Sequence, residues 1–231
     1  MTGTIAEVAL AGLFLVVSHI GVSSTGLRGA LVARLGERPY LGLYSLLSVL
    51  AFVWLGAAYR AAPVVLLWEY RPWQAWVPVL VNPVALLLVV AGLSTANPSA
   101  VGQAALLDRP DPARGILRVT RNPFLWGVGL WALAHMVPNG DAASLLLFGS
   151  LAVLALGGTV LLDAKLARRL GPSWDRFAAA TSNLPFAAIL AERQRLSARE
   201  IGWRRLIVAL VAYAVILHLH ARVFGVPAMP G

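Results

Sequence analysis

The chain contains no cysteine among its 231 residues. This absence excludes disulfides, cysteine-ligated zinc, iron–sulfur clusters, thiolate-ligated haem and covalently attached c-type haem. Charge is also scarce: Asp, Glu, Lys and Arg make up 13% of the residues, against about 25% in soluble domains, and 59% of the residues are hydrophobic. So few charged side chains cannot solvate the surface of a soluble domain. The composition therefore predicts a membrane protein.

Long runs without any charged residue indicate where the chain crosses the membrane. A helix needs about 20 mainly apolar residues to cross a hydrocarbon core of roughly 30 Å. The runs lack the period-two alternation of a transmembrane β-barrel. We therefore predict an all-α fold, a single polytopic membrane domain over residues 1–231 with about six transmembrane helices. They are expected near residues 5–23, 40–59, 76–96, 123–138, 142–162 and 204–224.

Basic residues are distributed unevenly between the two ends of these helices. Of the 19 basic residues, only Arg60, Arg71 and Arg222 lie on one side. The others lie in the connections 24–39, 97–122 and 163–203 and in the first turn of the last helix. By the positive-inside rule the basic connections are cytoplasmic, which predicts periplasmic termini and a multi-pass protein of the bacterial inner (plasma) membrane. The net charge of +9 then reflects topology, and we expect the lipid bilayer, and not nucleic acid, as the partner.

Two patterns in the connections predict local structure. Asp141 follows the turn dipeptide Asn139-Gly140, which predicts an N-cap for the next helix. Trp174 and Phe177 lie three residues apart beside Arg176, a spacing typical of a short interfacial helix on anionic lipid.

Histidines are the main candidates for chemistry within the spans, because polar residues there are costly. His19 lies late in the first predicted span, and His135 lies in the fourth, with Trp131 one turn earlier on the same face. For a single intramembrane histidine, a satisfied interhelical hydrogen bond is as good an interpretation as a functional role. His218 and His220, near the outer end of the last span, favour an interfacial anchor.

Two imidazoles on different helices suggest one specific cofactor, a haem b. Imidazole is the usual non-covalent protein ligand of haem iron. Arg28, Arg118 and Arg121 are candidate partners of its propionates, because guanidinium binds carboxylate in a two-point fork. At 1.5 Å per residue, His19 lies roughly 7–10 Å and His135 about 18 Å inside the cytoplasmic edge. Both reach one iron only if the fourth span starts high, tilts or is broken near its first proline.

Short segments of the chain occur in a characteristic order and spacing. They are Ser18-His19, Leu27-Arg28-Gly29, residues 35–40, Leu43-Tyr44-Ser45, Trp68, residues 115–121, residues 131–135, Asn139-Gly140-Asp141, Thr181-Ser182 and Pro185-Phe186. With these segments the chain resembles the NnrU family of bacterial membrane proteins over residues 5–190, and the last helix, 204–224, follows. The resemblance implies a link to denitrification, in the reduction of nitrite and nitric oxide, with respiratory nitrogen-oxide reductases as partners.

The plant and cyanobacterial ζ-carotene isomerases are similar to this domain and are described as haem b proteins. Their proposed iron ligands match His19 and His135. The resemblance therefore implies a haem b bound by these two histidines and cis–trans isomerisation of a lipid-soluble polyene such as ζ-carotene. The further cofactor-binding residues that it implies are Arg28, Tyr44, Arg118, Arg121 and Trp131.

The chain departs from these relatives at two positions. Asn122 stands where the family usually has the histidine of an Arg-His-Pro signature, and Ala132 stands where the isomerases carry a cysteine. A thiolate ligand that switches with redox state is therefore excluded. The Arg-His-Pro signature also resembles isoprenylcysteine carboxyl methyltransferases. Two alternatives thus stay open: a membrane methyltransferase that binds S-adenosylmethionine through Arg118 and Arg121, and a non-catalytic assembly partner of respiratory complexes.

Overall fold

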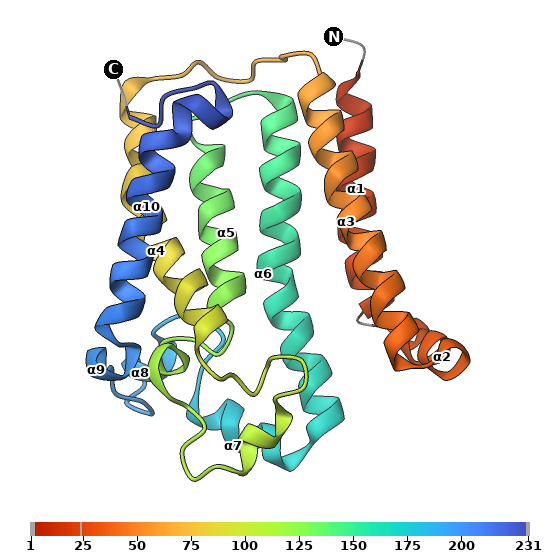
Figure 1. Ribbon diagram of the computed structural model, residues 1–231, viewed down its shortest axis with the longest axis vertical. Coiled ribbons are helices and arrows are strands. Elements are labelled where there is room, and N and C mark those ends of the chain that lie inside the picture. Colours follow the sequence, from red (N-terminus) through yellow and green to blue (C-terminus); the bar gives the residue numbers. More distant parts are fainter. Residues whose placement is uncertain (1–2, 24, 230–231) are drawn as a thin grey trace.

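Apolar runs fold into long helices and the polar connections into short ones (Figure 1). The computed structural model describes residues 3–23 and 25–229, and within these ranges it contains no strand, only an isolated β-bridge. The prediction of an all-α fold is confirmed. The helices are α1 (Ile5–Ser23), α2 (Gly26–Leu35), α3 (Glu37–Ala61), α4 (Pro72–Ser94), η1 (Ala104–Asp108), η2 (Gly115–Arg118), α5 (Pro123–Met136), α6 (Ala142–Leu170), α7 (Pro172–Ala180), α8 (Ala187–Leu190), α9 (Ala198–Ile201) and α10 (Trp203–Phe224).

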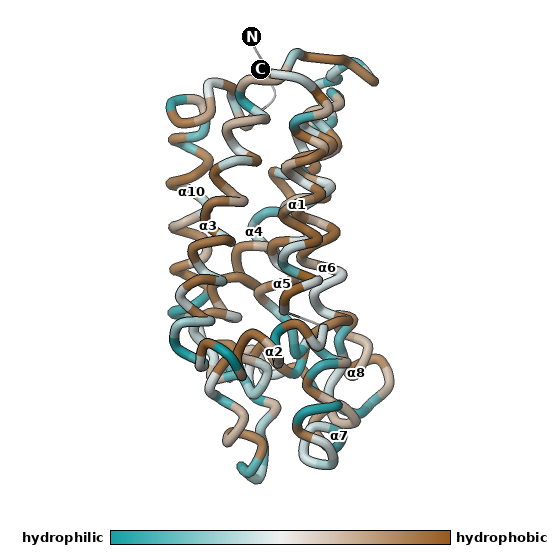
Figure 2. Tube along the Cα trace, turned by 90° about the vertical axis from the view of Figure 1, so that its right-hand side faces the viewer, coloured by the Kyte–Doolittle hydropathy of each residue, from teal (hydrophilic) through white to brown (hydrophobic). Residues whose placement is uncertain are grey.

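The long helices form a row in which each packs against the next, in the order α3, α1, α6, α5, α4 and α10 (Figure 1). The long helices run side by side, so the row has two faces where they end. The start of α1 and the end of α10 lie at one of these helix ends, and α2 and α7 to α9 lie at the other. Figure 2 shows that the row is mostly apolar and that polar residues gather near α2 and α7. In the part of the chain that is described, five helices are long and apolar enough to cross a membrane: α1, α3, α4, α6 and α10. The protein is therefore a multi-pass membrane protein.

The remaining predicted span, α5, is short. It has 14 residues, or about 21 Å at 1.5 Å per residue, which is less than a full crossing needs. Two glycines let it approach both neighbours closely. A Cβ on Gly127 would lie 2.6 Å from the carbonyl oxygen of Ala85 in α4, and one on Gly129 would overlap the side chain of Leu156 in α6. The predicted helix at 123–138 is thus present, as a short element in the middle of the row.

Tyr213 of α10 binds α4 at a point where a proline opens the helix. Pro83 has no N–H, so it cannot donate to the carbonyl of Val79 four residues earlier. The Tyr213 hydroxyl donates to this carbonyl over 2.8 Å. The hydrogen bond satisfies a carbonyl that the proline leaves without its helical partner, and it joins α10 to α4.

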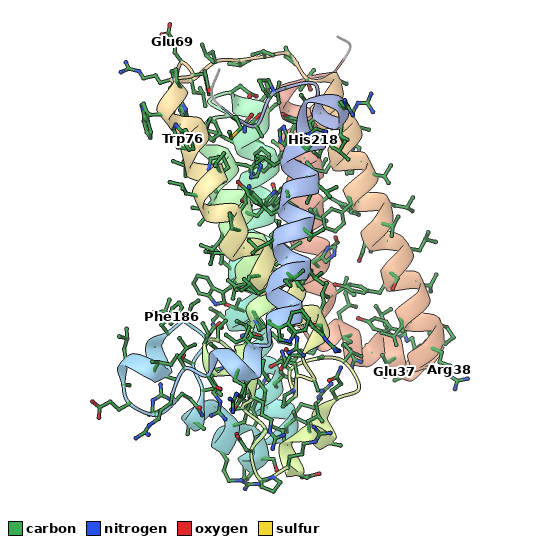
Figure 3. The ribbon with its side chains drawn as sticks, turned by 60° about the vertical axis from the view of Figure 1, so that its left-hand side comes forward. Glu37, Arg38, Glu69, Trp76, Phe186 and His218 are labelled. Atoms are coloured by element: carbon green, nitrogen blue, oxygen red, sulfur yellow. The ribbon has the colours of Figure 1, made fainter. Side chains whose placement is uncertain are left out.

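The turn before α6 has the predicted cap. The Oδ1 of Asp141 accepts a hydrogen bond from the backbone N–H of Ser144 over 2.9 Å, so the prediction is confirmed. The connection between α3 and α4 crosses this turn, and the Nε1 of Trp68 donates to the carbonyl of Val137 over 3.1 Å. The same end of the row carries Glu69 and Trp76, opposite to Glu37 and Arg38 (Figure 3).

At the other end, the connections 95–122 and 171–202 fold together into a cap. Trp174 and Phe177 of α7 are each 2% exposed and pack in one cluster with Leu166 of α6. The prediction that these aromatic side chains lie on anionic lipid is therefore wrong. An amphipathic spacing shows that one face of a helix is apolar, and here that face is covered by protein.

Candidate functional site

His19 lies on the buried stripe of α1, at the point where the neighbouring helices separate. Val8, Ala11 and Leu15 of this stripe are fully buried, whereas His19, one turn further, is half-buried. The Nδ1 of His19 lies 2.8 Å from the Leu15 carbonyl oxygen. Because a carbonyl only accepts, Nδ1 carries the proton and Nε2 carries the lone pair of the neutral ring.

α3 and α6 approach each other at the helix ends near the start of α1 and separate toward the helix ends near α2 (Figure 1). Where they meet, the hydroxyl oxygens of Tyr59 and Ser144 are 3.0 Å apart. Where they separate, the His19 ring contacts Tyr44 and Phe52 of α3, with ring centroids 5.6 and 6.0 Å apart. We name this region, lined by His19, Tyr44 and Phe52, the α3–α6 fork.

The mouth of the α3–α6 fork carries basic side chains. Residues 41–50 of α3 are not buried, and no described residue of α2 is buried either. Arg28 of α2 donates to Glu37 over 2.6 Å and lies over the Tyr40 ring, 5.4 Å from its centroid. Lys165 of α6 lies within electrostatic range of both Arg28 and Glu37. The aromatic rings of the α3–α6 fork therefore lie next to a group of cations from α2 and α6.

His135 lies in the last turns of α5, near the helix ends that are remote from α2 and the cap. Its Nδ1 lies 2.8 Å from the Trp131 carbonyl oxygen, so it has the same tautomer as His19. Its ring stacks on Phe148 of α6, with centroids 5.2 Å apart, and contacts the Trp131 ring at 5.0 Å. His218 of α10 also lies toward this end (Figure 3).

His19 and His135 belong to two helices, α1 and α5, that pack on opposite sides of α6. Gly12 of α1 packs directly against Ser150 of α6, whereas His135 stacks on Phe148, two residues earlier. Since successive residues of an α-helix are about 100° apart, α1 and α5 contact nearly opposite faces of α6. His19 also lies seven residues beyond Gly12, or about 10 Å further along the axis of α1. The structure does not bring the two imidazoles together.

Arg118 of η2 and Arg121, three residues later, were candidates to bind the haem propionates, and both already bind carboxylates of the protein. Arg118 donates to Asp111 over 2.8 Å and to Glu200 over 2.9 and 3.1 Å. The hydrogen bond between them raises the pKa of Arg118 and lowers the pKa of Glu200. Arg121 forms a two-point ion pair with Asp163. Neither guanidinium can bind a haem propionate or the carboxylate of S-adenosylmethionine without breaking an ion pair.

Sequence reasoning missed a polar cluster between α5, α6 and the cap. Asp163 accepts hydrogen bonds from Arg121, at 2.5 to 3.0 Å, and from Asn122, at 3.1 Å. The Asn122 amide also donates to Asn183 over 3.2 Å, and the Asn183 amide donates to Thr159 over 2.9 Å. We name these five residues the polar cluster. Arg121 and Asn122 were singled out in the sequence for other roles, and the signal for the carboxylate that joins them was that Asp163 is the single acidic residue of the long apolar α6.

The family model described as NnrU protein matches residues 7–228, almost the whole chain. The chain belongs to the NnrU family. Similar curated proteins include the chloroplastic 15-cis-zeta-carotene isomerases of Zea mays, 33% identical over 97 residues, and of Arabidopsis thaliana, 38% identical over 101 residues. Each match covers 41% of this chain and 26% of the relative, so the chain spans about a quarter of the length of these relatives. No solved structure matches.

The residues do not fit a haem b shared by His19 and His135, which is the arrangement that the NnrU resemblance implies. Metal–imidazole bonds of about 2 Å place two ligands on opposite sides of one iron about 4 Å apart, whereas the His19 ring contacts α3 and the His135 ring contacts α6, on helices that pack on nearly opposite faces of α6. Each imidazole alone fits as a ligand. A backbone carbonyl holds its Nδ1–H and orients Nε2, as is usual for metal-bound histidine.

Asn122, at the position where the resemblance implies a histidine, lies at a structural junction in this NnrU protein. It is 3% exposed, and both hydrogens of its amide group are used within the polar cluster. An amide group supplies two donors at one nitrogen, which a single imidazole nitrogen cannot do. The substitution therefore fits a buried junction between a carboxylate and a second amide.

Proposed function

We propose that this NnrU protein is a membrane isomerase that takes a lipid-soluble polyene from the bilayer into the α3–α6 fork and acts on it beside His19. The observation that carries the proposal is the fork itself. It places one half-buried imidazole between two aromatic rings, where α3 leaves α6. The similarity to proteins named 15-cis-zeta-carotene isomerase supports a polyene as the substrate class.

A polyene has the properties that such a region accommodates. It carries no group that needs a strong hydrogen bond, so apolar and aromatic contacts supply its binding, and one polar group is sufficient for chemistry. Tyr44 and Phe52 would position the conjugated chain against the His19 ring. His19 alone would hold a haem b, and that group would supply metal chemistry that lowers the barrier to rotation about a double bond. Substrate and product have the same formula, so the reaction has no leaving group to accommodate.

We further place the protein in a bacterial inner membrane, with the cap and α2 on the cytoplasmic side. The positive-inside distribution of the basic residues supports this orientation. A link to nitrite and nitric oxide reduction is supported by the family resemblance alone.

The test is expression in cells that accumulate 15-cis-ζ-carotene, kept in the dark, with carotenoid isomers separated by chromatography. We expect the wild-type protein to lower the 15-cis fraction and His19→Ala to abolish this effect. His218→Ala, which removes an imidazole far from the α3–α6 fork, is the matched control and should behave as wild type. If the wild-type protein is present in the membrane and the isomer ratio does not change, the proposal is wrong.

A further inference from the structure

A pocket of about 250 Å³ lies at the cap end of α4 and α10. It is distant from the α3–α6 fork, because α4 and α10 are the last helices in the packing order and α3 is the first (Figure 1). Its lining includes Thr95 after the end of α4, Arg109 and Arg114 of the cap, and Arg205 in the first turns of α10. We name it the arginine pocket.

The charges around the arginine pocket leave a positive excess. Two carboxylates line it, those of Asp111 and Glu200, and Arg118 binds both. Three guanidiniums line the pocket, those of Arg109, Arg114 and Arg205. With Arg118, which binds both carboxylates, four cations stand against two anions, so the charge around the pocket is positive.

Two of the guanidiniums form no ion pair among the described residues, although Arg114 lies within electrostatic range of Glu200. Within the described residues, neither Arg109 nor Arg114 forms an ion pair, and both side chains are exposed. Arg205, in contrast, holds α10 to α4, donating to the Ser94 hydroxyl and carbonyl over 2.8 and 3.0 Å. The pocket thus has one fixed arginine and two that can close on a ligand.

Thr95 gives a second and independent indication of a ligand. Its hydroxyl oxygen is buried, and it has no hydrogen-bond partner among the described residues. Buried hydroxyl groups almost always have a partner, because leaving one unpaired costs about 1–3 kcal/mol. Thr95 lines the arginine pocket, so a phosphate oxygen bound there lies near an unused donor as well as the guanidiniums.

We propose that the arginine pocket binds the phosphate group of an anionic phospholipid of the cytoplasmic leaflet. A lipid is favoured over a soluble phosphate because apolar surface continues from the pocket along both helices. Leu93 of α4 is 72% exposed and Leu206 of α10 is 45% exposed, each next to a residue that holds or lines the pocket. Acyl chains can lie on this surface while the phosphate group enters between the arginines. Basic pockets between helices on the cytoplasmic side recognise anionic headgroups in this way.

The test uses the full-length protein in nanodiscs of phosphatidylcholine, with or without phosphatidylglycerol. Native mass spectrometry then measures the phosphatidylglycerol retained per protein, and thermal unfolding measures its stabilising effect. We expect the double variant Arg109→Gln, Arg114→Gln to retain phosphatidylglycerol roughly 25-fold more weakly, since each basic side chain near an anionic leaflet contributes about fivefold. Thr95→Val, which keeps the shape and removes the donor, should weaken retention by a smaller factor. The matched control is Arg34→Gln, Arg38→Gln, with the same charge change at exposed arginines outside the pocket.

Three outcomes distinguish the sources of the phosphate group. Loss of retention in the pocket variants with wild-type behaviour in the control supports the lipid. Stabilisation by inorganic phosphate, compared with chloride at equal ionic strength, without preference for phosphatidylglycerol overturns the lipid and assigns the pocket to a soluble phosphate. Equal losses in the pocket and control variants overturn the site, because charge alone then explains binding.

Discussion

Replacing Asp163 with alanine removes the carboxylate that joins α6 to the cap and leaves the Arg121 guanidinium without its counter-charge. The two side chains are 17% and 12% exposed, and the carboxylate accepts from Arg121 at 2.5 to 3.0 Å and from Asn122 at 3.1 Å. Removing one partner of a buried pair costs about 3–5 kcal/mol. Because both side chains retain some contact with water, we expect the lower end, about 3 kcal/mol of unfolding free energy.

The origin of this cost can be tested with a second change. Most of the penalty comes from the Arg121 guanidinium that is left buried without a counter-charge. The double variant Asp163→Ala, Arg121→Met should therefore lose at least about 1 kcal/mol less unfolding free energy than the sum of the two single losses. Unfolding in mixed micelles with added dodecyl sulfate can be followed by the fluorescence of the eight tryptophans. Asp108→Ala, at an exposed carboxylate of η1, is the control and should change stability by less than about 0.5 kcal/mol. A cost below about 1 kcal/mol for Asp163→Ala, or strictly additive costs, would refute the reasoning.

Three further predictions follow from other contacts. Visible spectra of protein purified from haem-replete cells should show a Soret band that His19→Ala removes and His135→Ala leaves; loss in both variants would mean that the helices rearrange to share one iron. The hydrogen bond from Arg118 lowers the pKa of Glu200, as does one from a backbone N–H. The stabilisation from this carboxylate is therefore full above its ordinary pKa and is lost as pH falls through the lowered value. In Glu200→Gln, the melting temperature should depend less on pH across that acidic range than it does in the wild-type protein. Tyr213→Phe leaves a carbonyl of α4 without a donor and should cost about 1–2 kcal/mol in the same micelle assay; no change would show that water or another donor replaces the hydroxyl.

The helices themselves could be predicted from the sequence, because charge-free runs are the dominant signal in a membrane chain. The first predicted helix, 5–23, agrees with α1, and the predicted continuation of the span 142–162 through residues 165–169 agrees with the end of α6 at Leu170. The buried side of that last part shows the limit: Leu166 packs on the cap, whereas Arg168 and Arg169 are exposed. Composition distinguishes apolar from polar segments, but it does not show whether protein or lipid covers a given face.

The candidate site could be predicted only as a set of residue types. An interhelical hydrogen bond was the expectation for an intramembrane histidine, whereas each Nδ1 lies against a backbone carbonyl of its own helix, four residues earlier. The positions of His19 and His135 were evident. Their separation was not evident, because it depends on which faces of α6 receive α1 and α5, and that is decided by small residues such as Gly12 and Gly129. The partners of the arginines were hidden for a similar reason. Arg118 and Glu200 are 82 residues apart in the chain and meet only when the cap folds.

The arrangement of the row separates the proposed chemistry from the interactions that stabilise the fold. α1 and α3 pack on the other long helices through α6, and the α3–α6 fork opens where they leave it. The cap, the polar cluster and the arginine pocket all lie on the opposite side, where α4, α5, α6 and α10 are tied together. Opening of the fork to admit a long apolar molecule therefore breaks none of the ion pairs of the cap. A variant of the polar cluster should lower stability at unchanged isomer ratio, and a variant of the fork should do the reverse. Each class of variant serves as the control for the other.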